Sequence, residues 1–241
     1  MMRRFYSPEI NVDQNQLVLV GEEHHHARNV LRLEAGEDIS VFDGLGREFL
    51  CRIDKLDKKE ADLTVLREID PTAPESPVEI TLASVAIPGD KYDLVVQKAV
   101  ELGVVNFVPL TSARCELKLK DLGKKIDRWR RIALDASKQC GRARLMTIQE
   151  VLDARDLTAS TNNGHLRIFF SERAGWKMPS SEQPKMITAV IGPKGGWEDA
   201  EIESAEAAGF NIVTLGGRIM RAETAAISLT AILQNKFGDL N

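Results

Sequence analysis

Cysteine is scarce in this sequence of 241 residues, which has three: Cys51, Cys115 and Cys140. They are odd in number and widely spaced, and none lies in a CxxC pair. This spacing excludes a disulfide framework and the paired cysteines of a structural zinc site. Unpaired thiols fit a reducing compartment, so we expect a cytoplasmic protein.

Long apolar runs are missing too. No run reaches the ~18 residues that a membrane span needs. The chain also turns polar within its first few residues, without the apolar core of a signal peptide. Two phosphate-binding patterns, GxxxxGK[ST] and GxGxxG, are absent as well. We therefore expect neither a membrane protein nor a protein that binds nucleoside triphosphates or dinucleotides.

The charge is unevenly distributed although its total is only -4. Between Arg114 and Arg144 there are eleven basic and four acidic residues, a local charge of +7 that leaves -11 for the rest. Such a segment can bind a polyanion even in an acidic protein, because the affinity depends on local phosphate contacts. A solvated helix face explains the same charges equally well.

The first 70 residues favour β-structure. Residues 17–20, 39–42 and 48–53 are short runs of β-prone residues, and one helix is expected over Glu22 to Leu33. Three prolines then follow within residues 71–77, a composition typical of a stiff linker. We therefore predict a small β-domain over residues 1–72 and a second domain over residues 73–241.

The second domain changes to alternating strands and helices. Expected strands cover residues 80–87, 104–110, 166–170, 187–191 and 211–215, and expected helices cover 90–102, 124–140, 198–208 and 223–237. This alternation is typical of an α/β fold with a parallel sheet. The last helix is apolar on nearly all sides, which indicates a dimer interface.

Two glycine-rich segments each follow a buried strand of this domain. The first is Gly192-Pro193-Lys194-Gly195-Gly196-Trp197, and the second begins Leu215-Gly216-Gly217 and continues to Thr224. Ligands bind at the carboxyl ends of strands in open parallel sheets, and glycine lets the backbone approach a ligand closely. Because no phosphate loop is present, these turns suit an adenosine-like ligand, although such turns are often purely structural.

These two segments resemble the signature loops of SPOUT methyltransferases. Within that class, the order of motifs resembles the family that makes N3-methyluridine in 16S ribosomal RNA, including Gln97 to Gly103 and Lys138 to Arg142. The resemblance implies an N-terminal PUA-like β-barrel and a C-terminal parallel α/β domain with a trefoil knot. It further implies S-adenosylmethionine as cofactor, 16S ribosomal RNA of the small ribosomal subunit as partner, and a homodimer.

The resemblance and the chemistry together give a set of candidate residues. The expected cofactor-binding residues are Ile191, Gly192, Gly195, Gly196, Leu215, Gly216, Ile219, Met220, Thr224 and Ala225. Arg221 is expected to stabilise negative charge on the uracil, and Glu223 either accepts its proton or caps the last helix. The expected RNA-binding residues are Arg3, Arg4, Arg28, Arg32, Arg114 and Arg142.

A lysine in the first glycine-rich segment, a run of three histidines and two tryptophans are further features of the sequence. Lys194 stands where the resembling family usually has Glu. A loop that acts through its backbone tolerates this exchange, whereas a loop that needs a structural ion pair of the Glu would be looser here. The run His24-His25-His26 does not predict a metal site, because three consecutive helical residues point in different directions. Trp129 lies on the apolar side of its expected helix, so we expect it in the core, and Trp197 is expected to close the cofactor loop.

Two other classes of function are compared with the same features of the sequence: an RNA-binding protein and an oxidoreductase. A non-catalytic RNA-binding or ribosome-assembly protein on the same fold would show the same basic segment without holding a methyl donor. A nucleotide-dependent oxidoreductase is disfavoured by the missing dinucleotide pattern.

Overall fold

The computed structural model describes residues 2–10, 14–157, 165–173, 175–179 and 183–240. Contacts divide the chain into two compact units. The N-terminal unit comprises Met1–Glu75 and Ser137–Leu145, and the α/β unit comprises Ser76–Ala136 and Met146–Asn241. The N-terminal unit thus includes a segment from far along the chain.

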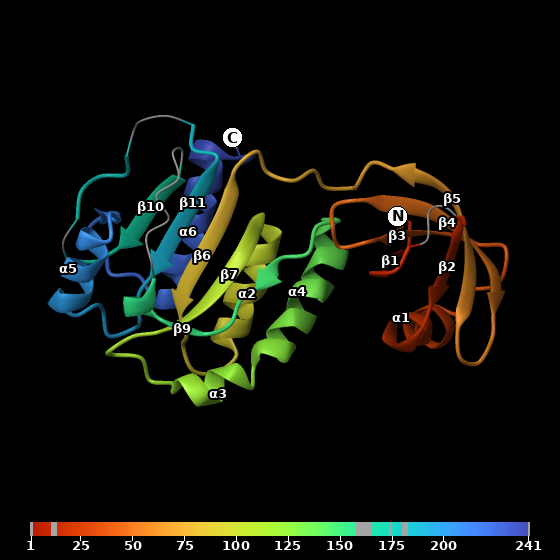
Figure 1. Ribbon diagram of the computed structural model, residues 1–241, viewed down its shortest axis with the longest axis horizontal. Coiled ribbons are helices and arrows are strands. Elements are labelled where there is room, and N and C mark those ends of the chain that lie inside the picture. The colour runs from red at the N-terminus through yellow and green to blue at the C-terminus, as the bar shows by residue number, and fades with distance from the viewer. Residues whose placement is uncertain (1, 11–13, 158–164, 174, 180–182, 241) are drawn as a thin grey trace. The chain divides into compact units, whose positions relative to one another are not determined.

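The N-terminal unit is built on one five-stranded sheet (Figure 1). Its strands are β1 (Arg4–Tyr6), β2 (Gln16–Leu19), β3 (Asp38–Phe42), β4 (Glu48–Leu56) and β5 (Ala61–Ile69), in the order β1-β3-β4-β5-β2. Only β1 and β3 pair in parallel. The prediction of a mostly β-structured first part is confirmed, although β1 and β5 were not predicted.

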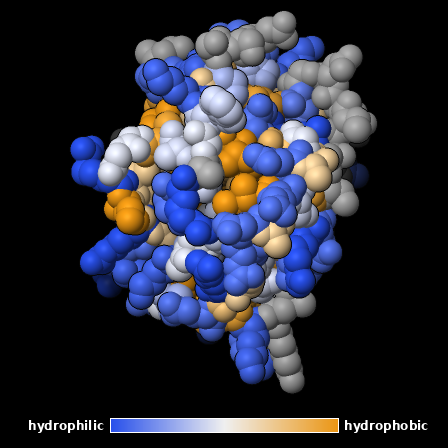
Figure 2. All heavy atoms as spheres, turned by 90° about the vertical axis from the view of Figure 1, so that its left-hand side faces the viewer, coloured by the Kyte–Doolittle hydropathy of each residue, from blue (hydrophilic) through white to orange (hydrophobic). Residues whose placement is uncertain are grey.

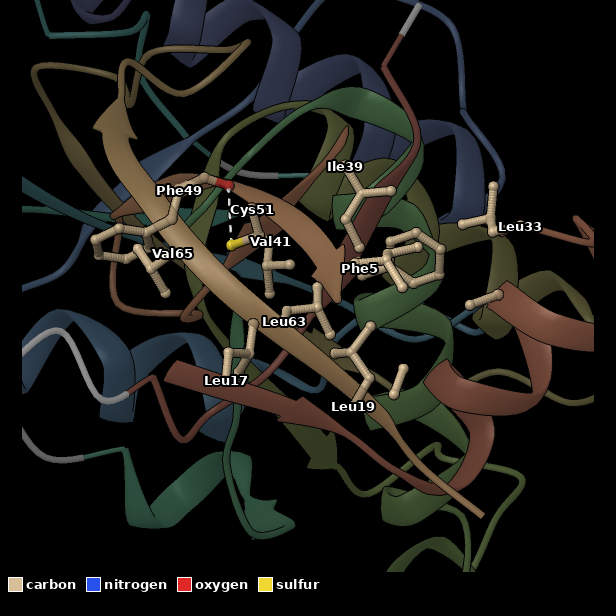
Figure 3. Packing of buried hydrophobic residues seen from close by; sticks show 13 residues of the cluster. Phe5, Leu17, Leu19, Leu33, Ile39, Val41, Phe49, Cys51, Leu63 and Val65 are labelled. Carbon is tan, nitrogen blue, oxygen red and sulfur yellow. Dashed lines mark hydrogen bonds between the residues drawn. The ribbon is translucent and has the colours of Figure 1, made fainter. Parts of the chain in front are cut away.

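One cluster of buried apolar side chains forms the core of the N-terminal unit (Figure 3). Phe5 of β1, Ile39 of β3 and Cys51 of β4 are completely buried and point into it. The Cys51 thiol donates to the carbonyl of Phe49, and its burial raises its pKa to about 12. This cysteine is therefore a protonated core residue with the packing role of a small apolar side chain.

The expected N-terminal helix is present but irregular. Helix α1 covers Gly21–His25, and a π-helical turn, η1, continues over His26–Val30. His24 is buried with Nε2 3.0 Å from the carbonyl oxygen of Asp57, whereas Nδ1 of His25 contacts Asn29. The neighbouring histidines therefore have separate partners.

The α/β unit holds a parallel sheet with the order β12-β10-β11-β6-β7-β8, and β9 pairs with β7 (Figure 1). Its strands are β6 (Glu79–Val85), β7 (Val104–Thr111), β8 (Thr147–Ile148), β9 (Leu152–Asp153), β10 (His165–Phe170), β11 (Met186–Ile191) and β12 (Asn211–Val213). Its helices are α2 (Lys91–Glu101), α3 (Leu119–Gly123), α4 (Ile126–Cys140), the short 3-10 turn η2 (Ala154–Asp156), α5 (Asp199–Ala207) and α6 (Ala222–Phe237). The last residues of α4, from Ser137 on, belong to the N-terminal unit. Every strand pairing in it is parallel, which confirms the predicted fold class.

Helix packing follows the predicted apolar faces. Tyr92 and Val96 of α2 are buried, and Trp129 of α4 is 1% exposed, as predicted for a core residue. Leu233 of α6 is fully buried, but Ile232 is 41% exposed, so α6 keeps an exposed apolar position within this unit. No helix in the described ranges is long and apolar enough to cross a membrane.

The strand order determines where loops meet. Strand β10 lies between β11 and β12, and all three run in the same direction. Their carboxyl ends therefore lie side by side, although other segments separate them in the sequence. Figure 2 shows the face of this unit near α5, where apolar side chains are visible among mostly hydrophilic ones.

Candidate active site

A pocket with a cavity volume of about 150 Å³ lies at the carboxyl ends of β10, β11 and β12. Its lining comes from three loops and helix α6: Phe170, Ser171, Glu172, Ile191, Gly192, Pro193, Val213, Thr214, Leu215, Gly216, Gly217, Arg218, Ile219, Met220, Ala222, Ala225 and Leu229. The two glycine-rich segments predicted from the sequence thus border one pocket.

Most of the expected cofactor-binding residues line this pocket. These are Ile191, Gly192, Leu215, Gly216, Ile219, Met220 and Ala225. Gly195, Gly196 and Thr224 are outside the lining, and the first two shape the loop behind it. The assignment of all ten to cofactor binding stays a prediction.

A third segment, Phe170 to Glu172, was not among the sequence candidates. The Ser171 amide donates to the Val213 carbonyl over 3.0 Å, and Thr214 Oγ1 donates to the Ser171 carbonyl over 2.7 Å. The segment therefore joins the loop after β12 to the end of β10. The sequence signal that could have indicated this segment is the pair of polar residues directly after the buried strand β10. It was missed because no glycine follows the strand directly.

The first glycine loop packs closely around Trp197. This side chain is completely buried, and its Nε1 donates to the carbonyl of Phe170 over 2.8 Å. A Cβ atom at Gly192 would lie 2.6 Å from Trp197 Nε1, so only glycine fits there. Gly196 has a positive φ of 71°, which glycine adopts without strain. Trp197 thus closes this loop from behind the pocket.

The outer side of the same loop is held by polar contacts. Arg114 Nη1 donates to the Gly195 carbonyl over 3.0 Å, and its Nε lies 3.7 Å from Glu198. A capping box between Glu198 and Glu201 starts helix α5 directly after the loop. Lys194 is 79% exposed and lies 3.9 Å from Glu116, so this side chain is directed to solvent.

The second glycine loop leaves more of its residues exposed. Ile219 is 87% exposed, and Gly216, Gly217 and Arg218 are exposed as well. The loop ends at Arg221, whose backbone forms the N-cap of α6. This loop therefore presents backbone groups and apolar atoms at the mouth of the pocket.

Arg221 and Glu223 follow the second loop just outside the pocket lining. Arg221 is exposed. Glu223 accepts a hydrogen bond from Lys91, with Nζ 2.9 Å from Oε1, and this contact lowers its pKa below the ordinary value. A lowered pKa makes a carboxylate a weaker proton acceptor, so the geometry favours the role of Glu223 in the first turn of α6.

The expected RNA-binding arginines fall into two groups. Arg4 is almost buried, pairs with Glu48 at 2.9 Å and donates to the carbonyls of Ser137 and Arg142 over 2.8 Å. Arg142 is buried beside Glu75, with Nη2 2.7 Å from Oε2. Both guanidinium groups therefore hold segment Ser137–Leu145 within the N-terminal unit, a contact that the sequence did not indicate.

The remaining arginines are more accessible. Arg3 lies 3.9 Å from Glu37 with 45% of its side chain exposed, Arg28 is half-buried, and Arg32 is exposed. Arg114 contacts the first glycine loop as described. Arg3, Arg28 and Arg32 belong to the N-terminal unit and Arg114 to the α/β unit, and their assignment to RNA binding stays a prediction.

Ion pairs neutralise several of the basic residues of α4. Arg128 pairs with Asp93 of the α/β unit at 2.6 Å, and Lys138, which belongs to the N-terminal unit, pairs with Glu23 of that unit. Arg131 remains exposed. The high local charge therefore reflects structural ion pairs as well as surface charge.

The chemistry of the pocket fits S-adenosylmethionine better than a nucleotide. Ile191, Leu215 and Leu229 offer apolar walls for an adenine, and the glycine loops offer backbone groups for its edges. Glu172 and Arg218 bring one charge of each sign, which suits the zwitterionic amino-acid end of this cofactor. The lining lacks the cluster of cations that a phosphate chain would need, and the described ranges contain no group of three residues that could hold a metal ion.

Comparison with known proteins defines the class. The profile of the RNA methyltransferase domain matches residues 74–234, and that of the RNA methyltransferase PUA domain matches residues 19–66. A two-unit chain with a pocket of this kind is thus an RNA methyltransferase with a PUA domain, which confirms the predicted PUA-like and parallel α/β fold class.

Individual relatives identify the family within that class. Ribosomal RNA small subunit methyltransferase E of Aquifex aeolicus is 33% identical over 97% of this chain and 100% of its own length. The crystal structure of the same-named protein from Neisseria gonorrhoeae bound to S-adenosyl methionine has a TM-score of 0.91 and 34% identity, with 100% of both chains covered. A putative methyltransferase of Legionella pneumophila in complex with SAM has a TM-score of 0.89 and 31% identity, with 100% of both chains covered. The chain belongs to the ribosomal RNA small subunit methyltransferase E family.

Proposed function

We propose that this protein uses S-adenosylmethionine to methylate N3 of a uridine in 16S ribosomal RNA of the small ribosomal subunit. The observation that carries the proposal is the single pocket bordered by both glycine loops at the carboxyl ends of parallel strands. Family members are named for methylation of small-subunit ribosomal RNA, and one was crystallised with this cofactor. Uridine N3 as the target rests on the family resemblance of the sequence.

The reaction forms an N3–methyl bond, breaks the bond between the methyl group and the donor sulfur, which leaves as a neutral thioether, and transfers the uracil N3 proton to a base. When bound, S-adenosylmethionine supplies a methyl group that its sulfonium already activates. The protein then has to orient the base in line with that methyl group and stabilise negative charge on the uracil. The expected cofactor-binding residues that line the pocket form the wall that holds the methyl donor in this orientation, and Gly195, Gly196 and Thr224 support that wall from outside the lining.

Arg221 is the proposed catalytic residue. It follows Met220 of the lining directly, and its exposed guanidinium lies at the start of α6. A cation at this place can stabilise the uracil anion as it forms. Glu223 is the second candidate, either as proton acceptor or in support of the helix start, and its ion pair with Lys91 favours the latter.

RNA binding is assigned to the N-terminal unit and the surface near the first loop. The proposed RNA contacts are Arg3, Arg28, Arg32 and Arg114, whereas the buried ion pairs of Arg4 and Arg142 favour a structural role.

The proposal also includes a boundary between RNA-binding residues 1–72 and methyltransferase residues 73–241. It further includes a knotted chain path through the glycine loops, a homodimer that covers exposed positions of α6, and action in the cytoplasm, where ribosomal RNA is found.

An Arg221→Ala variant tests the proposal. We expect methylation of 16S ribosomal RNA to fall by roughly 100-fold or more, because one charge-stabilising group is removed. Cofactor affinity by calorimetry and thermal unfolding should stay near those of the original protein. Arg155→Ala is the matched control, since Arg155 is 74% exposed and pairs with Asp153 away from the pocket.

Full turnover by Arg221→Ala would remove this residue from the mechanism. Mass spectrometry of ribosomal RNA from a strain without the gene identifies the modified nucleotide. If that RNA keeps N3-methyluridine and the purified protein binds no S-adenosylmethionine, a non-catalytic RNA-binding role replaces the enzyme.

A further inference from the structure

One aromatic side chain of the α/β unit faces solvent. Trp176 is 82% exposed, whereas Trp129 and Trp197 are 1% and 0% exposed. Among the aromatic side chains that the structure describes, Trp176 is the only exposed one. Tryptophan is highly buried on average, so this exposure leaves an unusually large apolar surface open to a ligand.

The backbone of Trp176 is fixed although its ring is exposed. Its amide donates to the Ile212 carbonyl over 2.9 Å, and its carbonyl accepts from the Thr214 amide over 3.2 Å. A Cβ atom at the preceding Gly175 would lie 2.8 Å from the Thr214 amide nitrogen, so the backbone there lies too close to the loop after β12 for any other residue. Trp176 is therefore held at the edge of the sheet.

The strand register places Trp176 beside the pocket. Trp176 forms a parallel bridge with Val213, and Val213 is the register partner of Phe170 in β10. Register partners in neighbouring strands point to the same face of a sheet, so these three side chains form one row. Val213 and Phe170 line the pocket, and so does Thr214, which is bonded to Trp176. The exposed ring therefore continues the pocket wall at the edge of the sheet.

Methylation at N3 requires an unpaired uridine. N3 lies on the edge that uracil uses for Watson–Crick pairing, so a paired uridine cannot present it to a methyl donor. Enzymes that act on such a base bind it outside its stack, and proteins that bind single-stranded RNA stack unpaired bases on aromatic side chains. A base next to the target uridine thereby loses a stacking neighbour. An exposed aromatic ring beside the pocket can replace that neighbour.

We propose that Trp176 stacks on an unpaired base that flanks the target uridine and so positions the RNA at the pocket. The inference rests on the proposed function and adds to it a positioning residue outside the cofactor site. Every base has a π-face, so we expect a preference for single-stranded over duplex RNA and little preference among sequences. Lys177, which follows directly in the chain, is exposed as well, and single-strand binders combine aromatic rings with cations in this way.

RNA binding by Trp176→Ala tests this role, with a single-stranded oligouridine of roughly ten nucleotides as the probe. We expect the dissociation constant to rise about tenfold, because the stacking of one base is lost. The slope of its salt dependence should stay the same, since no charge is removed. Methylation of small-subunit ribosomal RNA should show a raised KM for RNA with a nearly unchanged kcat, and cofactor affinity by calorimetry should not change.

Two further variants separate stacking from other roles of the side chain. Trp176→Phe keeps an aromatic ring and should recover most of the RNA affinity, whereas Trp176→Leu keeps only apolar bulk and should not. Leu152→Ala is the matched control, because Leu152 is 38% exposed and lies in β9, which pairs with β7 and not with the strands at the pocket. This control should change neither the RNA affinity nor the KM.

Tryptophan fluorescence of the original protein gives a test without any variant. Trp129 and Trp197 are buried, so quenching by oligouridine reports on Trp176, and the quenching should disappear in Trp176→Phe. Absence of quenching in the original protein, or of any binding of single-stranded RNA, would overturn the inference.

The variants add three contrary results. Unchanged RNA affinity in Trp176→Ala would overturn the inference, as would equal losses in Trp176→Ala and Trp176→Phe. A lower molar mass of Trp176→Ala by light scattering would overturn it too, because the ring would then belong to an interface between copies of this chain. Thermal unfolding of each variant identifies misfolding. An original protein that stacks RNA on Trp176 but binds no S-adenosylmethionine would contradict the proposed function and leave the stacking role intact.

Discussion

The two glycine loops that border the pocket are held in different ways. The loop after β11 packs on the completely buried Trp197 and accepts hydrogen bonds from Arg114 and Arg173 through its carbonyls. The loop after β12 begins with bonds of Thr214 to Ser171 and Trp176, and then runs through exposed residues to Ile219. One wall of the pocket is supported by the protein interior, and the other is mostly exposed.

This difference assigns separate tasks to the two loops. A wall fixed by buried contacts can hold the cofactor in one orientation, which lowers the entropy cost of the reaction. An exposed wall next to Arg221 is accessible to a large substrate such as RNA. Substitutions in the first loop should therefore affect stability and cofactor binding, and those in the second should affect methyl transfer.

The largest effect is expected from Trp197→Ala. Removal of this buried side chain and of its hydrogen bond to Phe170 should lower the free energy of unfolding by about 3–5 kcal/mol. Urea denaturation measures the loss, and calorimetry should show strongly weakened cofactor binding. Trp176→Ala is the control, because Trp176 is 82% exposed and its loss should cost under about 0.5 kcal/mol. Similar costs for both tryptophans would contradict the contrast between a buried and an exposed wall.

A smaller effect is expected from Arg114→Gln. Its hydrogen bond to Gly195 is exposed to solvent, so its loss should weaken the free energy of cofactor binding by at most about 1 kcal/mol, or roughly fivefold in affinity. Calorimetry measures this, with Arg130→Gln on α4 as a control of equal charge change.

The same Arg114 variant distinguishes loop support from RNA contact. If Arg114 binds a phosphate, RNA affinity falls and the slope of its salt dependence drops by about one. Weaker RNA binding with unchanged cofactor affinity would show that the first loop does not depend on this arginine.

The smallest effect is expected from Lys194→Glu. Lys194 is 79% exposed and is separated by 3.9 Å from Glu116, so its ion pair contributes little. Cofactor affinity should change less than about twofold by calorimetry. A larger change would mean that the side chain at this position, and not the backbone alone, shapes the first loop.

Much of the fold could be predicted because its signals are local. The apolar spacing of α2 and the β-prone runs of β6, β7, β10 and β11 each lie within one short window. Strand β1, Arg4–Tyr6, is too short for a periodic pattern and exists because it pairs with β3, whose residues lie 36 positions later, as in the pair of Arg4 with Ser40. Short strands of this kind depend on their partners more than on their own sequence.

The site was predictable in part for the same reason. Glycine after a buried strand marks the two loops, but nothing local marks Glu172, which reaches the pocket because β10 lies between β11 and β12. Arg4 and Arg142 looked like RNA ligands because their partners, Glu48 and Glu75, are 44 and 67 positions away. When the partner of an arginine lies so far away in the sequence, the neighbouring residues do not show whether the arginine is paired or exposed.

The sequence by itself determined the succession of strands and helices, the two glycine turns and the family resemblance, because these depend on residues close together in the chain. Only the tertiary structure decided which turns share a pocket, which carboxylate lies in it and which cations are already neutralised. Those outcomes depend on the order of strands in the sheet and on the burial of charge, and both arise from contacts between distant residues.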